Sequence, residues 1–103
     1  MTYDEKIKCS EIYKIIFGTQ VNPDYWNEDA ANKLAEIVQR ILTCTELVHL
    51  IPRGPGNDWV WLLSEVYGVL KRRYSNDPKE FYNMCLVFVV ANHKRELDYL
   101  LIN

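Results

Sequence analysis

The fold class is decided by residues 27–48, which read NEDAANKLAEIVQRILTCTELV. Apolar or small side chains recur at a spacing of three or four residues for about five turns, at Ala31, Leu34, Ala35, Val38, Ile41, Leu42, Thr45 and Val48. The opposite face is polar and carries Asn32, Lys33, Glu36, Gln39, Arg40 and Thr43. Asn27 supplies an N-cap, and Glu28 and Asp29 place negative charge in the first turn. The pattern predicts a long amphipathic helix over residues 28–50.

A second helix is predicted upstream, over residues 3–17. Thr2 followed by Glu5 fits a capping box, in which each residue satisfies an N–H of the other. The helix ends at Gly18, because glycine adopts the left-handed conformation at low cost. One face of this helix is apolar and consists of Cys9, Ile12, Tyr13 and Ile16. Asn22-Pro23 then indicates a turn before the next helix.

Two further helices are predicted after residues 52–57, PRGPGN, whose two prolines and two glycines cannot continue a helix. Asp58 can cap a helix over residues 58–74, and its last turn carries the cations Lys71, Arg72 and Arg73 against the helix dipole. Asp77, Pro78 and Glu80 then stand at the N-cap, first and third positions of a helix over residues 78–101.

Residues 86–90, LVFVV, leave an alternative open, because this apolar run has high strand propensity. The helix is preferred since its start is strongly capped and an apolar stripe extends beyond the run, at Tyr82, Leu86, Val89, His93, Leu97 and Leu100. Four helices with short connections predict an all-α fold, a compact antiparallel bundle that forms a single domain over residues 1–103.

Composition narrows the class of protein. The chain has 103 residues, of which 49% are hydrophobic and 25% charged, which excludes an intrinsically disordered chain. A net charge of -2 provides no basic excess of the kind that nucleic-acid binders carry. Neither a signal peptide nor an apolar run of about 20 residues is present, so the expected location is not the membrane. Cys9, Cys44 and Cys85 lack the spacing of a metal site, and reduced thiols in the cytoplasm are expected.

No catalytic or cofactor motif emerges. His49 and His93 are the only histidines, and neither stands in a pattern such as HExxH. Cys44 with His49, or Cys85 with His93, can form a nucleophile and base only if the fold brings them together. Residues 54–56, Gly-Pro-Gly, lack the Lys-Ser/Thr of a phosphate-binding loop. We therefore expect a protein that is not an enzyme and has no metal site or cofactor.

The strongest candidate for recognition is the acidic and aromatic stretch at residues 24–29. The whole net charge falls in residues 21–56, where five acids stand against three bases. Tyr and Trp are common in interface hot spots, and acidic residues speed capture of a basic partner. The predicted partner-binding residues are Asp24, Tyr25, Trp26, Glu28 and Asp29, extended along the following helix by Glu36 and Glu46. The alternative for Trp26 is a hydrophobic staple that folds back between the first two helices.

These features favour a non-catalytic protein-binding module, most simply an inhibitor of a basic effector. Immunity proteins and antitoxins use this design, and so does a phage-encoded inhibitor of host nucleic-acid-handling machinery. The alternative is a small regulatory protein that binds nucleic acid through two basic clusters, Lys71, Arg72 and Arg73 beside Tyr74, and Lys94 and Arg95. The simpler interpretation is that both clusters are cations that complement the dipoles of solvated helix ends, and that Glu96 and Asp98 compensate the second cluster. The two hypotheses predict opposite charge on the partner.

Overall fold

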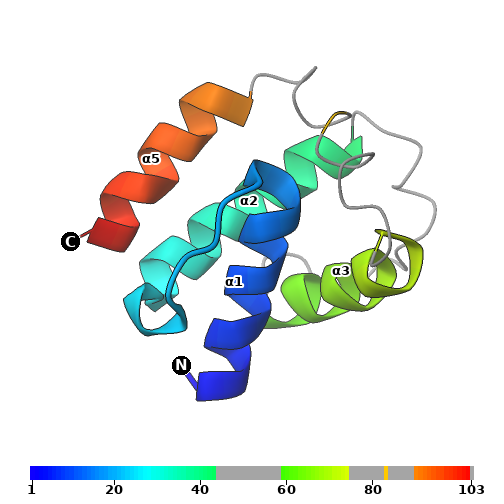
Figure 1. The fold of residues 1–103 in the computed structure, drawn as a ribbon, viewed down its shortest axis with the longest axis horizontal. Helices are drawn as coiled ribbons and strands as arrows, with labels where there is room; N and C mark the ends of the chain where they lie inside the picture. The colour runs from blue at the N-terminus through cyan, green and yellow to red at the C-terminus, as the bar shows by residue number, and fades with distance from the viewer. Residues whose placement is uncertain (44–58, 75–82, 84–89, 103) are drawn as a thin grey trace.

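A computed structural model of the chain describes residues 1–43, 59–74, 83 and 90–102. The elements in these ranges are α1 (Tyr3–Phe17), the short 3-10 helix η1 (Pro23–Tyr25), α2 (Glu28–Thr43), α3 (Trp59–Tyr74) and α5 (Val90–Ile102) (Figure 1). All regular structure in the described ranges is helical, so the predicted all-α fold is confirmed.

The ends of α1 follow from local hydrogen bonds. The Thr2 hydroxyl accepts from the Glu5 N–H at 3.2 Å, and the Glu5 carboxylate accepts from the Thr2 N–H at 2.8 Å. This capping box lowers the pKa of Glu5. Gly18 closes the helix with φ of 76°, and its N–H donates to the Lys14 carbonyl at 2.8 Å. Both predicted ends of the helix are therefore confirmed.

α2 also begins where its sequence predicts. The Asn27 side-chain oxygen accepts from the Ala30 N–H at 2.8 Å and so caps the helix. The described part of the predicted apolar face is buried, with the addition of Ala30 and Ile37, and consists of Ala31, Leu34, Ala35, Val38, Ile41 and Leu42. The polar face is exposed apart from Lys33, which is half-buried. The amphipathic helix is confirmed as far as Thr43.

Several predictions fall outside the described residues. They are the last turns of the helix at 44–50, the proposed cap Asp58, the helix start at Asp77, Pro78 and Glu80, and residues 86–89 of the apolar run. Val90, the last residue of that run, is the first residue of α5.

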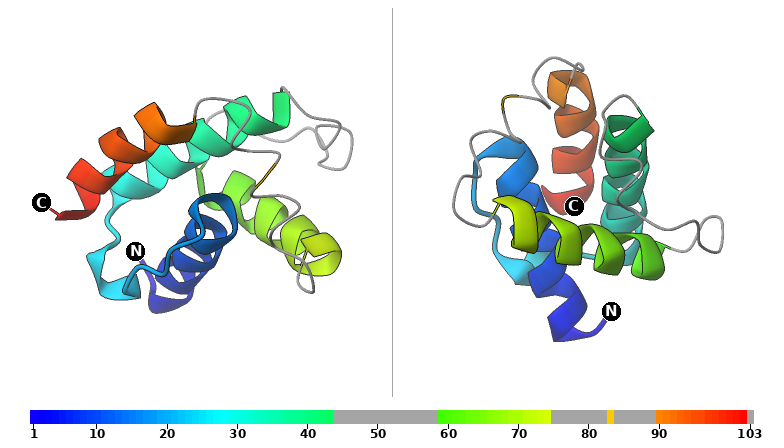
Figure 2. Two further views of the ribbon diagram at one scale, coloured as in Figure 1. Left: turned by 45° about the horizontal axis from the view of Figure 1, so that its top comes forward. Right: turned by 90° about the vertical axis from the view of Figure 1, so that its right-hand side faces the viewer.

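The helices do not all pack in one antiparallel set. α5 lies alongside α2 with the opposite chain direction in Figure 1 and in both views of Figure 2. α3 instead contacts α1 and α2 and lies steeply across both, as the right-hand view of Figure 2 shows. The helical bundle is confirmed, but the uniformly antiparallel arrangement is not. Short connections favour antiparallel neighbours, whereas the crossing angle depends on how side chains of different helices interlock.

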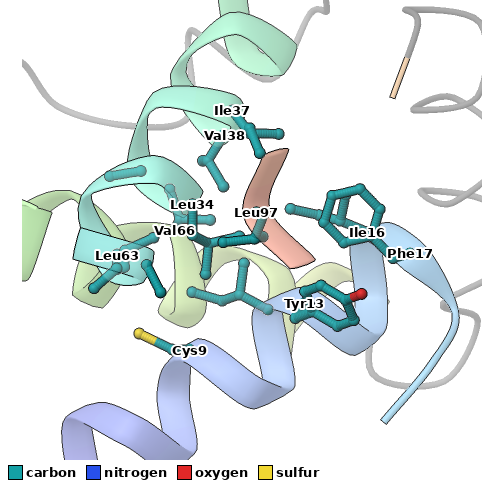
Figure 3. Close-up of a cluster of buried hydrophobic side chains, with 14 of the residues drawn as sticks. Cys9, Tyr13, Ile16, Phe17, Leu34, Ile37, Val38, Leu63, Val66 and Leu97 are labelled. Atoms are coloured by element: carbon teal, nitrogen blue, oxygen red, sulfur yellow. The ribbon is translucent and has the colours of Figure 1, made fainter. Parts of the chain in front are cut away.

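One core joins the four α-helices of the described ranges. Figure 3 shows side chains of α1, α2, α3 and α5 converging, with Leu34, Val66 and Leu97 among them. Leu97 is fully buried, and burial of a leucine side chain contributes about 1.5–3 kcal/mol. α3 contributes the buried residues Leu63, Val66, Val69 and Leu70. None of the helices in the described ranges has the length and apolar character needed to cross a bilayer.

Substitution by alanine is expected to change the stability of the fold in opposite directions at Gly68 and Gly18. A methyl group at Gly68, inside α3, would meet no neighbouring heavy atom within 4 Å, so Gly68→Ala is expected to stabilise the fold by about 0.5–1 kcal/mol. Gly18→Ala should destabilise it by about 1 kcal/mol, because alanine is strained at a φ of 76°. Chemical denaturation of both variants measures the difference. A destabilising Gly68→Ala would contradict this account of α3.

Candidate functional site

The stretch at residues 24–29 is anchored by Trp26, which is only 2% exposed. Its indole N–H donates to the Ser10 hydroxyl at 2.7 Å, and its ring meets that of Tyr13 edge-on at a centroid distance of 6.1 Å. The structure therefore supports the staple interpretation of Trp26. It also corrects the predicted contact surface, because a ring packed against α1 has no face to offer a partner.

The backbone on both sides of Trp26 is held by local hydrogen bonds. The Asn22 side-chain oxygen accepts from the Asp24 N–H at 3.0 Å, and the Tyr25 N–H donates to the Asn22 carbonyl at 3.1 Å. On the other side, Asn27 caps α2 and its amide also donates to the Leu100 carbonyl at 3.5 Å. The segment thus has a defined conformation and contacts α1, α2 and α5.

Four predicted contact residues of this segment lie on the surface: Asp24, Tyr25, Glu28 and Asp29. Tyr25 is 61% exposed, and the three acids are also exposed. None of these acids forms a salt bridge with another residue of the described ranges. We call these four residues the acidic surface. It combines uncompensated negative charge with one aromatic ring on a fixed backbone.

Glu36 and Glu46, the predicted extension along α2, do not enlarge the acidic surface in the same way. Glu36 is exposed, but its carboxylate lies 3.5 Å from the Lys33 ammonium and 3.3 Å from the Arg40 guanidinium. Two cations therefore compensate its charge locally. Glu46 lies outside the described residues.

The basic clusters of the alternative hypothesis lie on different parts of the molecule (Figures 1 and 2). Lys71, Arg72 and Arg73 are exposed at the end of α3. Lys71 donates to the Tyr67 hydroxyl at 3.2 Å, which raises the pKa of Lys71, and its ammonium stands 5.3 Å from the Tyr67 ring centre. On α5, Arg95 is exposed.

Lys94 is used inside the fold. Its ammonium donates to the Asp98 carboxylate at 2.6 Å and lies 5.8 Å from the centre of the Tyr13 ring. The Tyr13 hydroxyl donates to the other Asp98 oxygen, also at 2.6 Å. Burial raises the pKa of Tyr13, and the hydrogen bond to Asp98 raises it further. The predicted compensation of Lys94 by Asp98 is thus confirmed. The four-residue spacing of Lys94 and Asp98 signals their pairing, but nothing in the sequence signals the role of Tyr13.

A second polar link joins α2 to α5 and involves Lys33, Arg40 and His93. Lys33 forms an ion pair with Glu96, which lowers the pKa of Glu96. Arg40 lies 3.3 Å from Nε2 of His93, and since arginine only donates, Nε2 is the acceptor. Nδ1 of His93 is buried and has no hydrogen-bond partner within the described residues. His93 is therefore a half-buried residue of a helix interface.

The described residues do not assemble a metal centre. No group of three His, Cys, Asp or Glu side chains in these ranges is placed to hold a metal ion. Cys9 is fully buried, and burial raises the pKa of its thiol to about 12. His49, Cys44 and Cys85 lie outside the described residues.

Comparison with known proteins assigns no relative. No family model matches the chain, and neither a curated protein nor a solved structure matches it. Its function is therefore argued from the residues of the acidic surface and from the contacts that hold them.

The Trp26–Ser10 bond predicts a non-additive pair of mutations. Ser10→Ala should cost about 1–3 kcal/mol, because it leaves the buried indole N–H without an acceptor. In a Trp26→Phe background the same substitution should cost much less, because phenylalanine has no N–H to satisfy. Free energies of unfolding for the four proteins of this cycle provide the measurement. Additive costs would mean that the bond contributes little.

The thiol of Cys9 should be inert in the folded chain. At neutral pH we expect its alkylation to be slow in the native protein and complete after denaturation, as followed by peptide-resolved mass spectrometry. Because the folded state favours the neutral thiol, Cys9 contributes fully to the free energy of unfolding below its ordinary pKa of 9.0. This contribution is lost as the pH rises towards about 12. Rapid labelling of Cys9 in the native state would contradict its burial.

Proposed function

We propose that this chain is a non-catalytic protein-binding module that captures a basic partner through the acidic surface. The supporting observation is that Asp24, Glu28 and Asp29 are exposed beside Tyr25 and form no salt bridge with any described residue, on a backbone fixed by Trp26 and Asn27. Elsewhere on α2 and α5 the charged residues Lys33, Glu36, Lys94, Glu96 and Asp98 are paired.

A fixed acidic surface suits fast and specific capture. Exposed like charges steer a partner of opposite sign and raise the association rate. Because the Trp26 anchor orders the segment before binding, little conformational entropy is lost when the partner docks. An aromatic ring such as that of Tyr25 then adds contact area at low entropic cost.

Inhibition is the use that fits such a surface best. A basic effector, such as a nuclease-like toxin, holds its nucleic acid on a positive surface, and an acidic protein blocks it by occupying that surface. We propose an immunity protein or antitoxin acting in the cytoplasm, or a phage-encoded inhibitor of host nucleic-acid-handling machinery. Both act by the same physical means.

The alternative is regulation through nucleic acid, and it has less support. Of its two clusters, the one on α5 contributes Arg95 alone as an exposed cation, since Lys94 binds Asp98. Lys71, Arg72 and Arg73 are exposed at the end of α3, where cations also complement the helix dipole. This cluster remains the residue set to test.

Charge reversal distinguishes the two functions. Asp24→Lys combined with Asp29→Lys should leave stability within about 1 kcal/mol, the loss coming from the helix-dipole contribution of Asp29. Binding of the partner should weaken, mainly through slower association, and the difference from wild type should shrink as salt rises. Affinity capture followed by mass spectrometry identifies the partner, and association kinetics then measure the effect.

Two controls complete this test. Glu11→Lys with Glu65→Lys makes the same change in net charge on α1 and α3 and should retain the partner. Lys71→Glu with Arg72→Glu should also retain it. A partner that survives reversal of Asp24 and Asp29 contradicts the proposal. A nuclease-sensitive partner that is lost only with Lys71 and Arg72 supports nucleic-acid binding.

A further inference from the structure

α5 packs against the rest of the described structure in a different way from the other helices. Within the described ranges, α1, α2 and α3 each contact both of the others, whereas α5 contacts mainly α2. Figure 1 and the left-hand view of Figure 2 show α5 at the edge of the described helices, alongside α2. Removal of α5 would therefore leave the mutual contacts of α1, α2 and α3 in place.

Few side chains of α5 reach the core. Of those that the structure describes, at residues 92–101, only Leu97 and Leu101 are buried. By comparison, α2 buries eight residues and α1 buries six. Because apolar burial is the main favourable contribution to folding, a helix with little of it can open at a lower free energy than global unfolding requires.

Polar contacts supply a large part of the attachment of α5. The links from α5 to Lys33 and Arg40 of α2 each include an exposed side chain, so water competes for them. The link to α1 is better protected, because Tyr13 is only 2% exposed and its hydroxyl donates to Asp98 at 2.6 Å. Lys94 donates to the same carboxylate and holds it in place. The Tyr13–Asp98 bond is therefore the main polar restraint on α5.

We propose that α5 is an undocking helix, which separates from a three-helix body of α1, α2 and α3 while that body stays folded. The Tyr13–Asp98 bond holds α5 in the docked state. Undocking exposes Leu97 and Leu101 together with the side of α2 on which α5 lies. This conformational change is independent of the proposed binding function.

Native-state hydrogen exchange of the full chain, followed by peptide-resolved mass spectrometry at several low denaturant concentrations, tests the proposal. Protection factors at residues 94–101 should be lower than those of the most protected amides of α1 and α2, by about tenfold or more. They should also depend less on denaturant, because undocking exposes less surface than global unfolding. Equal protection and equal denaturant dependence in all helices would overturn the proposal.

Two glycine variants outside α5 provide a second comparison. Gly18→Ala and Gly68→Ala are expected to change the stability of α1 and α3 in opposite directions. If α5 undocks alone, the body is folded before and after the opening, so the protection of α5 should not change. The most protected amides of α1 and α2 should change about two- to fivefold, because they exchange through global unfolding. Equal changes in α5, α1 and α2 would mean that α5 unfolds only with the whole chain.

Tyr13→Phe tests the polar restraint, because it removes the hydroxyl and keeps the ring. The protection of α5 should fall about tenfold, with its weak dependence on denaturant retained, since a hydrogen bond to a carboxylate is lost. Tyr3→Phe is the matched control, because Tyr3 lies on the same helix and is 62% exposed, and it should leave all protection factors unchanged. Unchanged protection of α5 in Tyr13→Phe would overturn the role of the Tyr13–Asp98 bond.

Discussion

The burial of Trp26 against α1 is the contact on which the rest of the candidate site depends. The indole N–H donates to Ser10 and the ring packs edge-on against Tyr13, so one side chain fixes the segment between α1 and α2. A buried indole without an acceptor would cost about 1–3 kcal/mol, and Ser10 removes that cost. Because Trp26 is held, the residues on either side have fixed positions, which brings Asp24, Tyr25 and the start of α2 to the surface together.

Polar links between helices compensate many of the charges on α2 and α5. Tyr13, Lys94 and Asp98 join α1 to α5, while Lys33 and Glu96 join α2 to α5. Partly exposed ion pairs of this kind contribute little to stability, about 0–1 kcal/mol. Their larger consequence is electrostatic, because they compensate charges along the helices and leave the acids of residues 24–29 uncompensated among the described residues.

The proposed binding function rests on the exposed acids and on the scaffold that holds them. Lys33 and Glu96 pair between α2 and α5, Lys94 and Asp98 pair within α5, and Cys9 is kept neutral by burial. A binding surface needs only complementary shape and charge on a stable scaffold, which a small helical core provides.

The sequence by itself determined the features that depend on neighbouring residues. The capping box at Thr2, the left-handed Gly18, the turn at Asn22 and the cap at Asn27 each involve residues no more than four positions apart, and their patterns identified both ends of α1 and the start of α2. The periodicity of α2 likewise predicted which side of the helix is buried. Only the tertiary structure decided between burial and exposure for Trp26, gave Lys94 and Tyr13 a common partner in Asp98, and laid α3 across the other helices. These outcomes depend on contacts between residues far apart in the chain, such as Tyr13 and Asp98, 85 positions apart, and local patterns carry no record of which distant side chains meet.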